Sequence, residues 1–177
     1  MNKRLFLTAA AALLMMGCAS TYEQKDMRPV VDTLDPTKSV LIAVPADGVY
    51  ETTVYENSGM MTAKAVMAAF AAHASRADLI EGCVGEDCLA VVNDTMCGYF
   101  VMPVIRHWED RATEWSGRSD RVEIQLVIFD ATTKQEIANS SYTGKSKWMT
   151  FGGDHPQDLL PEPTTDLVNA LYGVESS

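Results

Sequence analysis

The stretch Arg121–Asp130, with the sequence RVEIQLVIFD, decides the fold of this protein. Apolar side chains occupy every second position from its second residue onward. These positions are Val122, Ile124, Leu126 and Ile128. Strict alternation of apolar and polar residues predicts a β-strand with one face buried in a core. Val127 and Phe129 additionally make the far end of this strand apolar on both faces.

Two neighbouring stretches are expected to form strands beside it. Residues 99–107 (YFVMPVIRH) favour a strand, and Pro103 within them favours an edge position or a bulge, because proline cannot donate a ladder hydrogen bond. Residues 131–135 are typical of a turn, and residues 136–150 are expected to form the returning strand. The second half of the chain is therefore predicted to contain antiparallel hairpins.

Strands and helices alternate in the first half of the chain. Residues 39–45 (SVLIAVP) are expected to form a strand that proline ends, and residues 77–80 a shorter one. Between them, Ser58 is expected to cap a helix over residues 59–74. The buried face of this helix is predicted from residues that recur at helical spacing. They are Thr62, Val66, Ala69, Phe70 and His73.

Shorter helical segments complete the predicted elements. Residues 86–93 form a short helix anchored by Leu89 and Val92, and residues 156–160 form one helical turn ended by Pro161. A terminal helix over residues 165–172 turns three apolar residues inward. They are Leu167, Val168 and Leu171.

The order of these elements predicts an α/β (α+β) sandwich. Crossovers through helices make the early strands parallel, whereas the late hairpins add antiparallel strands. The expected architecture is a mixed sheet of about five strands with helices packed on it. Residues 39–174 are long enough to form a single globular domain with its own core.

The first residues have the features of an export signal. Lys3 and Arg4 form a basic start, and residues 5–16 (LFLTAAAALLMM) are apolar and uncharged. This run is too short to span a bilayer, and the small residue Gly17 follows it directly before Cys18. Residues 1–17 are therefore predicted to be a signal peptide, and residues 18–38 a polar, flexible tether.

Gly17 and Cys18 resemble the lipobox of bacterial lipoproteins, although Met15 stands where that motif usually has leucine. The resemblance implies that Cys18 carries diacylglycerol and an acylated amino terminus. Ala19, rather than aspartate, follows the cysteine, and this implies sorting to the outer membrane with the domain facing the periplasm. The alternative is cleavage after Ala19, which would release a soluble periplasmic protein.

The charge of the chain argues against nucleic-acid partners. The full sequence has 14 basic and 24 acidic residues, a formal net charge of −10. Without Lys3 and Arg4, 12 basic residues face the same 24 acidic ones, and the net charge becomes −12. Such a body repels nucleic acid and anionic headgroups, so membrane attachment is expected to come from the acyl chains.

Three sequence blocks resemble an uncharacterised family of proteobacterial lipoproteins. They are HWEDRATEWSG (residues 107–117), GKSKW (residues 144–148) and FGGDHPQDLL (residues 151–160). That family is known as a domain of unknown function, so the resemblance implies no activity. A weaker likeness, based on element order and on residues 98–101, is to envelope lipoproteins with the TolB amino-terminal fold, such as LpoB and CsgG.

The motifs of catalysis and cofactor binding give little support to an enzyme. Residues 144–146 imitate the end of a phosphate-binding loop, but Asn139 stands where that motif needs glycine and the segment is predicted to be a strand. His73, His107 and His155 lack the spacing of metal ligands. We therefore expect no catalytic residues, no metal and no cofactor. The rival classes are an enzyme acting on cell-wall material and a passive structural lipoprotein.

A partner-binding surface is expected around residues 108–121. Tryptophan and arginine are the residues most enriched in binding hot spots, and the arginines reverse the local charge of an acidic body. The expected surface comprises Trp108, Arg111, Trp115, Arg118, Arg121, Trp148 and Asp154. Its partner is expected to be another envelope protein or peptidoglycan. The alternative is a long hairpin whose charges pair across strands and whose tryptophans cover the core.

Export to an oxidising compartment permits disulfides. Once Cys18 is lipidated, three cysteines remain and one must stay unpaired. Cys83 and Cys88 flank a short polar loop that Gly85 allows to close, so this pair is expected, with Cys97 as a free buried thiol. The alternative is that Cys83 or Cys88 pairs with Cys97.

The lipobox interpretation is tested by Cys18→Ser. The variant should accumulate as unprocessed precursor and lose incorporated lipid label, because the acylated thiol is absent. The measurement is metabolic lipid labelling with fractionation of membranes. A variant that is still cleaved and appears soluble at normal amounts would contradict the lipidation.

Overall fold

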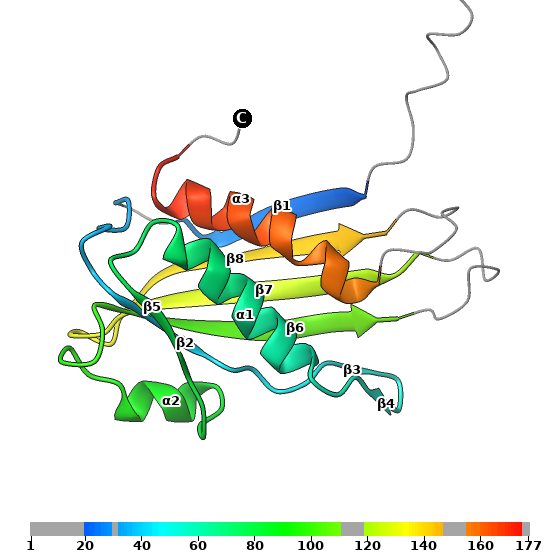
Figure 1. Cartoon of the computed structure of the whole chain (residues 1–177), viewed down its shortest axis with the longest axis horizontal. Helices are drawn as coiled ribbons and strands as arrows, with labels where there is room; N and C mark the ends of the chain where they lie inside the picture. Colours follow the sequence, from blue (N-terminus) through cyan, green and yellow to red (C-terminus); the bar gives the residue numbers. More distant parts are fainter. Residues whose placement is uncertain (1–19, 30–31, 111–118, 147–154, 175–177) are drawn as a thin grey trace, which may run out of the picture.

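A mixed six-stranded sheet forms the centre of the structure, a computed structural model that describes residues 20–29, 32–110, 119–146 and 155–174 (Figure 1). The strand order is β1-β8-β7-β6-β2-β5. The strands are β1 (Thr21–Arg28), β2 (Val40–Ala43), β5 (Ala77–Ile80), β6 (Tyr99–Glu109), β7 (Arg121–Asp130) and β8 (Glu136–Lys145). β2 pairs in parallel with β5 and β6, and the remaining neighbours are antiparallel. The predicted mixed α/β sandwich is confirmed.

Two helices cover one face of this sheet. They are α1 (Ser58–Ala71) and α3 (Pro161–Leu171), which lie side by side in Figure 1. The short helix α2 (Glu86–Val91) lies near one end of the sheet, and the 3-10 helix η1 (Pro156–Leu159) precedes α3. A small hairpin of β3 (Val49–Tyr50) and β4 (Thr53–Val54) leads into α1.

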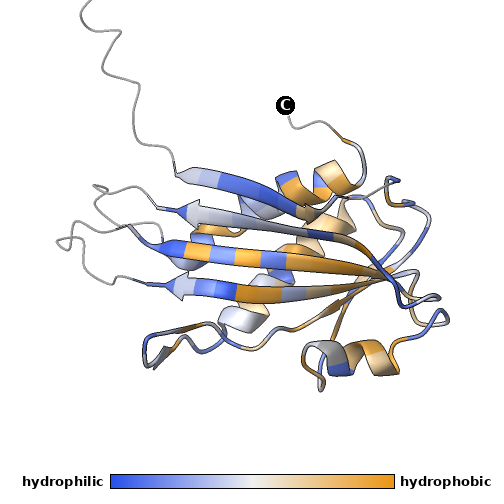
Figure 2. Cartoon of the chain, turned by 180° about the vertical axis from the view of Figure 1, so that it is seen from behind, coloured by the Kyte–Doolittle hydropathy of each residue, from blue (hydrophilic) through white to orange (hydrophobic). Residues whose placement is uncertain are grey.

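The alternation in β7 builds the main core. Val122, Ile124, Leu126 and Ile128 are all fully buried in one cluster with residues of α1 and α3. The opposite face of the sheet, seen in Figure 2, is hydrophilic toward the end where β6 and β8 finish and hydrophobic toward α2. There, Phe100, Val92 and Cys88 belong to a second, smaller cluster, against which Phe129 packs.

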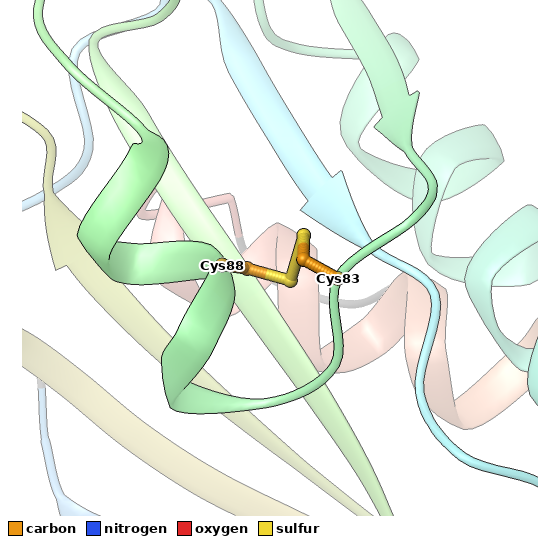
Figure 3. Close-up of a disulfide and its surroundings, with 2 residues drawn as sticks. All are labelled: Cys83 and Cys88. Atoms are coloured by element: carbon orange, nitrogen blue, oxygen red, sulfur yellow. A yellow bond between two sulfur atoms is a disulfide. The ribbon is translucent and has the colours of Figure 1, made fainter.

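The predicted disulfide is present. Cys83, in the loop after β5, is bonded to Cys88 of α2, with 5.1 Å between the two Cα atoms (Figure 3). Cys97 carries a free thiol in the same apolar cluster, and burial raises the pKa of that thiol above its usual range. The disulfide therefore fastens the loop and α2 over the second cluster.

The largest difference from the sequence prediction concerns the tether. Residues 18–38 were expected to be a flexible link, but Thr21–Arg28 forms β1, which pairs antiparallel with β8 over its length. Its residues are mostly polar and exposed, so no apolar alternation marks the strand. The sheet consequently has six strands rather than about five.

Helix starts also differ from prediction. Ser58 does not cap α1: it is buried as the first helical residue, and its hydroxyl accepts a hydrogen bond from the Gly48 amide at 2.8 Å. The amide of Gly59 instead donates to Asp47 Oδ1 at 2.8 Å, so a carboxylate from the preceding loop caps the helix. Pro161 begins α3 rather than ending a turn, which agrees with the preference of proline for the first helical position.

Two strand predictions are refined. Pro103 lies inside β6 and pairs with β7. The pairing of β6 with β2 ends at Val101, so at Pro103 one side of the strand has no neighbouring strand among the described residues, as expected for an edge position. β8 ends at Lys145, and the remainder of the predicted strand includes residues 147–150, which lie outside the described residues.

A buried hydrogen bond joins the sheet to α3. The hydroxyl groups of Tyr142 in β8 and Thr164 in α3 lie 2.7 Å apart, and both residues are fully buried. Burial raises the pKa of Tyr142 far above its ordinary value, so the phenol remains protonated and available for this bond. Each hydroxyl therefore satisfies the other where water has no access.

Tyr142→Phe should lower the free energy of unfolding by about 1–3 kcal/mol, because it leaves the Thr164 hydroxyl buried without its partner. The double variant Tyr142→Phe with Thr164→Val should recover part of this loss, since both polar groups are then removed. Urea denaturation of the two single variants and the double variant completes the cycle. Effects that simply add would show that the two hydroxyls are not coupled.

Candidate functional site

Four strands reach the same end of the sheet. Glu109 at the end of β6 pairs with Arg121 at the start of β7, Arg121 pairs with Lys145 at the end of β8, and Lys145 pairs with Thr21 at the start of β1. We call this the Arg121 end of the sheet, and it lies at the right of Figure 1. Besides this row it includes the adjoining residues Asp110, Asp120, Ser146 and His155.

The three blocks that carry the family resemblance meet at the Arg121 end. The first block leaves the sheet after Glu109, and the second contains Lys145 and Ser146. The third returns at His155, whose Nδ1 lies 3.7 Å from Asp110 Oδ1, a contact that becomes an ion pair when the histidine is protonated. Segments that are far apart in sequence therefore begin and end within one region.

Most of the expected partner-binding residues lie outside the described residues. Residues 111–118 contain Arg111, Trp115 and Arg118, and residues 147–154 contain Trp148 and Asp154. The described neighbours on either side of both segments are at the Arg121 end. Their grouping into one surface stays a prediction.

Trp108 is not at an exposed surface, and this expectation is wrong. Its side chain is only 3% exposed and belongs to the main core cluster, opposite Val122. The register between β6 and β7 shifts between Ile105 and His107, so Arg106 is an extra residue in β6. Such a bulge reverses the alternation beyond it and turns Trp108 toward the core.

Arg121 is the expected binding residue that the structure describes in an accessible position. Its side chain is 43% exposed, and its Nη2 lies 3.8 Å from Glu123 Oε2 on the same strand. This pair is exposed and long, so it constrains the guanidinium weakly. Lys145, exposed and next to Arg121 in register, adds a second positive charge and was not among the expected binding residues.

Acidic groups balance these charges among the described residues. Glu109 is 6% exposed, and His107 Nε2 lies 3.3 Å from its Oε2 atom. The ring of His107 also meets Tyr50 of β3 edge-on, at 5.1 Å between centroids. The local reversal of charge expected from three arginines therefore depends on Arg111 and Arg118, and the described part of the Arg121 end carries both signs.

Asp120 and Ser146 form a clamp at this end that sequence reasoning missed. The Asp120 amide donates to Ser146 Oγ at 2.8 Å, and the Ser146 amide donates to the Asp120 carbonyl at 3.0 Å. The clamp joins the residue before β7 to the residue after β8. Because the two residues are far apart in sequence, no spacing could have indicated the pair.

Two polar atoms at this end are buried without a hydrogen-bond partner among the described residues. They are Asp110 Oδ1 and Arg121 Nε. Buried polar atoms are usually satisfied by a partner.

The histidines have local structural contacts. His73 Nε2 lies 2.7 Å from Asn169 Oδ1 and its ring stacks on Tyr172, which fastens α1 to α3. The His155 amide donates to Asp158 Oδ2 at 3.0 Å and caps η1. Among residues 20–29, 32–110, 119–146 and 155–174, no group of three His, Cys, Asp or Glu side chains could hold a metal ion.

Residues 144–146 do not form a phosphate-binding loop. Gly144 and Lys145 are the last residues of β8, and Ser146 is engaged by Asp120. None of the helices that the structure describes has the length and apolar character needed to cross a membrane.

Solved structures share this fold. A PelC dodecamer from Paraburkholderia phytofirmans aligns with a TM-score of 0.62 at 10% identity, over 89% of this chain and 100% of that chain. A variant PelC dodecamer from the same organism gives 0.58 at 12% identity, over 86% and 95%. A DUF330 protein from Xanthomonas campestris gives 0.50 at 16% identity, over 82% and 94%. At such identities the likeness shows the fold alone.

The family itself is shown by sequence. A search of curated proteins finds no match to this chain. The sequence model of one protein family matches residues 32–171, well over half of the chain and nearly all of the predicted domain. The expected likeness to the TolB amino-terminal fold stays a prediction beside the matches to PelC and DUF330. This chain belongs to the family described as a domain of unknown function, DUF4823.

Proposed function

We propose that this protein is a non-catalytic lipoprotein of the outer membrane whose periplasmic domain binds another cell-envelope component through the Arg121 end. The observation that carries the proposal is the meeting of the three family blocks at one end of the sheet. The described part of the domain supplies Arg121, Lys145 and the Asp120–Ser146 clamp. The adjoining segments supply the expected tryptophans and arginines.

The anchor is supported by the amino-terminal sequence. An apolar run with a basic start ends at Gly17 and Cys18, which resemble a lipobox. The mature net charge of −12 offers no basic surface that would hold the domain on an anionic membrane. Acyl chains on Cys18 supply that attachment instead, since two or more chains anchor a protein stably.

The choice of a binding role over catalysis is supported by the contacts of the ionisable groups. The His155 amide donates to the Asp158 carboxylate at the start of η1, and the His107 ring contacts the Glu109 carboxylate at the end of β6. Both contacts hold local structure in place, as expected of ionisable groups with a structural rather than a catalytic role. The alternative enzyme acting on cell-wall material would need Asp154 to join Glu109 and His155 in one cleft.

The structural likeness to PelC suggests one class of partner. The two PelC structures are dodecamers, so further copies of this chain are one candidate for the envelope component. A different envelope protein is the other, and peptidoglycan is a third. A passive structural lipoprotein would have no partner at this end at all.

The test is photo-crosslinking in intact cells. A photoreactive residue in place of Arg121 should give a discrete adduct, because the side chain is accessible at the proposed surface. The matched control is Thr132, exposed in the turn between β7 and β8 at the opposite end of the sheet. Mass spectrometry of the adducts separates self-association from another protein and from peptidoglycan. Equal adducts from both positions, or none from Arg121, would contradict the proposal.

Two variants separate binding from stability. Trp115→Ala and Arg118→Ala should keep the wild-type melting temperature and lose the adduct formed through position 121. If Trp115 instead covers the core, its truncation would lower the free energy of unfolding by about 3–5 kcal/mol. Thermal unfolding of the purified variants beside crosslinking in cells distinguishes the two results, and a large stability loss with the adduct unchanged counts against the binding role.

A further inference from the structure

The pairing of β1 fixes the position of the chain just after the lipid-bearing cysteine. Thr21 pairs with Lys145, and the pairing continues along β1 to Arg28. Tyr22, the second residue of this strand, packs against the main core cluster. The start of β1 therefore belongs to the folded sheet, at its Arg121 end.

The remaining link to the anchor is very short. Only Ala19 and Ser20 lie between Cys18 and Thr21. Three residue steps span at most about 10 Å even when fully extended, because each step adds about 3.3–3.6 Å. A tether over residues 18–38 could have reached several times further, but the chain enters the sheet at Thr21, so only the residues before β1 are free to act as a link.

From this geometry we infer that the Arg121 end of the sheet faces the lipid surface that holds the protein, and that the headgroup layer is its immediate neighbour. The inference rests on the proposed acylation of Cys18. It assigns an orientation to the whole domain, because the sheet is continuous from β1 to β5.

The length of the strands places the two ends of the sheet at very different distances from Cys18. β7 has 10 residues, so the turn after it lies about 30 Å from Arg121 at the usual rise of about 3.4 Å per residue. That turn and α2 lie together at the far end (Figure 1). A link of about 10 Å cannot place the Arg121 end in the periplasm and the far end on the membrane without tearing β1 from β8.

The charges at the Arg121 end suit a zwitterionic lipid surface. Arg121 and Lys145 are accessible, and beside them the carboxylates of Glu123 and Asp110 are 37% and 30% exposed, so both signs are offered to the headgroups. The acidic excess of the whole domain would oppose a strongly anionic surface. A protein partner at this end must accordingly be present at the membrane surface.

The test measures how close each end lies to lipid. The full-length lipidated protein is placed in phosphatidylcholine vesicles that contain headgroup-spin-labelled phosphatidylcholine, which quenches fluorescence only over short distances. A fluorophore is attached to Lys145→Cys or, as the matched far-end control, to Thr132→Cys. The wild-type protein, whose Cys97 is buried, gives the labelling background.

Quenching should be several-fold stronger at position 145 than at position 132. A long Gly/Ser insertion between Ala19 and Ser20 should abolish this difference, because the domain is then free to turn. Equal quenching at both positions without the insertion, or stronger quenching at position 132, would overturn the orientation.

Flotation of the vesicles tests the proposed acyl anchor independently of the inferred orientation. If the protein does not float with lipid, or if Cys18→Ser floats equally well, the acyl anchor is what fails. If the wild-type protein floats and the variant does not, the quenching ratio alone decides the orientation. Circular dichroism of the labelled proteins shows whether the overall β-sheet content matches that of the wild type.

Discussion

The register of β7 against β6 and β8 is the constraint on which the rest of the structure depends. Ile124 pairs with Ile105 on one side and with Tyr142 on the other, so the three strands present one apolar face that α1 and α3 cover. A slip of one residue would exchange this face for the polar one. The same register aligns the end of β6, the start of β7 and the end of β8. The candidate site is therefore a consequence of the pairing that builds the core.

In the proposed lipoprotein, the edge strand β1 connects this core to the acylated Cys18. It adds little apolar surface, and its stability comes from the backbone ladder to β8 and from Tyr22. An edge strand of charged and polar residues also discourages pairing with other chains. By taking up the polar segment after Cys18, β1 converts what would be a flexible link into a short one. Under the proposed acylation of Cys18, membrane attachment and sheet pairing are thus coupled.

The likeness to PelC and to a DUF330 protein at 10–16% identity separates two kinds of information in the sequence. The fold needs only a pattern of apolar side chains at the right period, which many sequences supply. The blocks that carry the family resemblance include residues 107–117 and 144–148, whose described residues lie at the Arg121 end of the sheet. The blocks that carry the family resemblance therefore adjoin the end where we place the binding surface, while the disulfide between Cys83 and Cys88 fastens the opposite end.

The sequence by itself determined most elements, because helical and strand periodicities are local. The alternation in Arg121–Asp130 predicted the buried face of β7, and the loop between Cys83 and Cys88 predicted the disulfide. Tertiary structure alone decided the burial of Trp108, since a single bulged residue at Arg106, which no sequence pattern marks, changes which side chains of β6 face the core beyond it. It also decided that Thr21–Arg28 is a strand and that Asp47 caps α1. Neither follows a local pattern. A polar edge strand is held by its hydrogen bonds to β8, and Asp47 reaches the start of α1 only because the preceding loop folds back onto the helix.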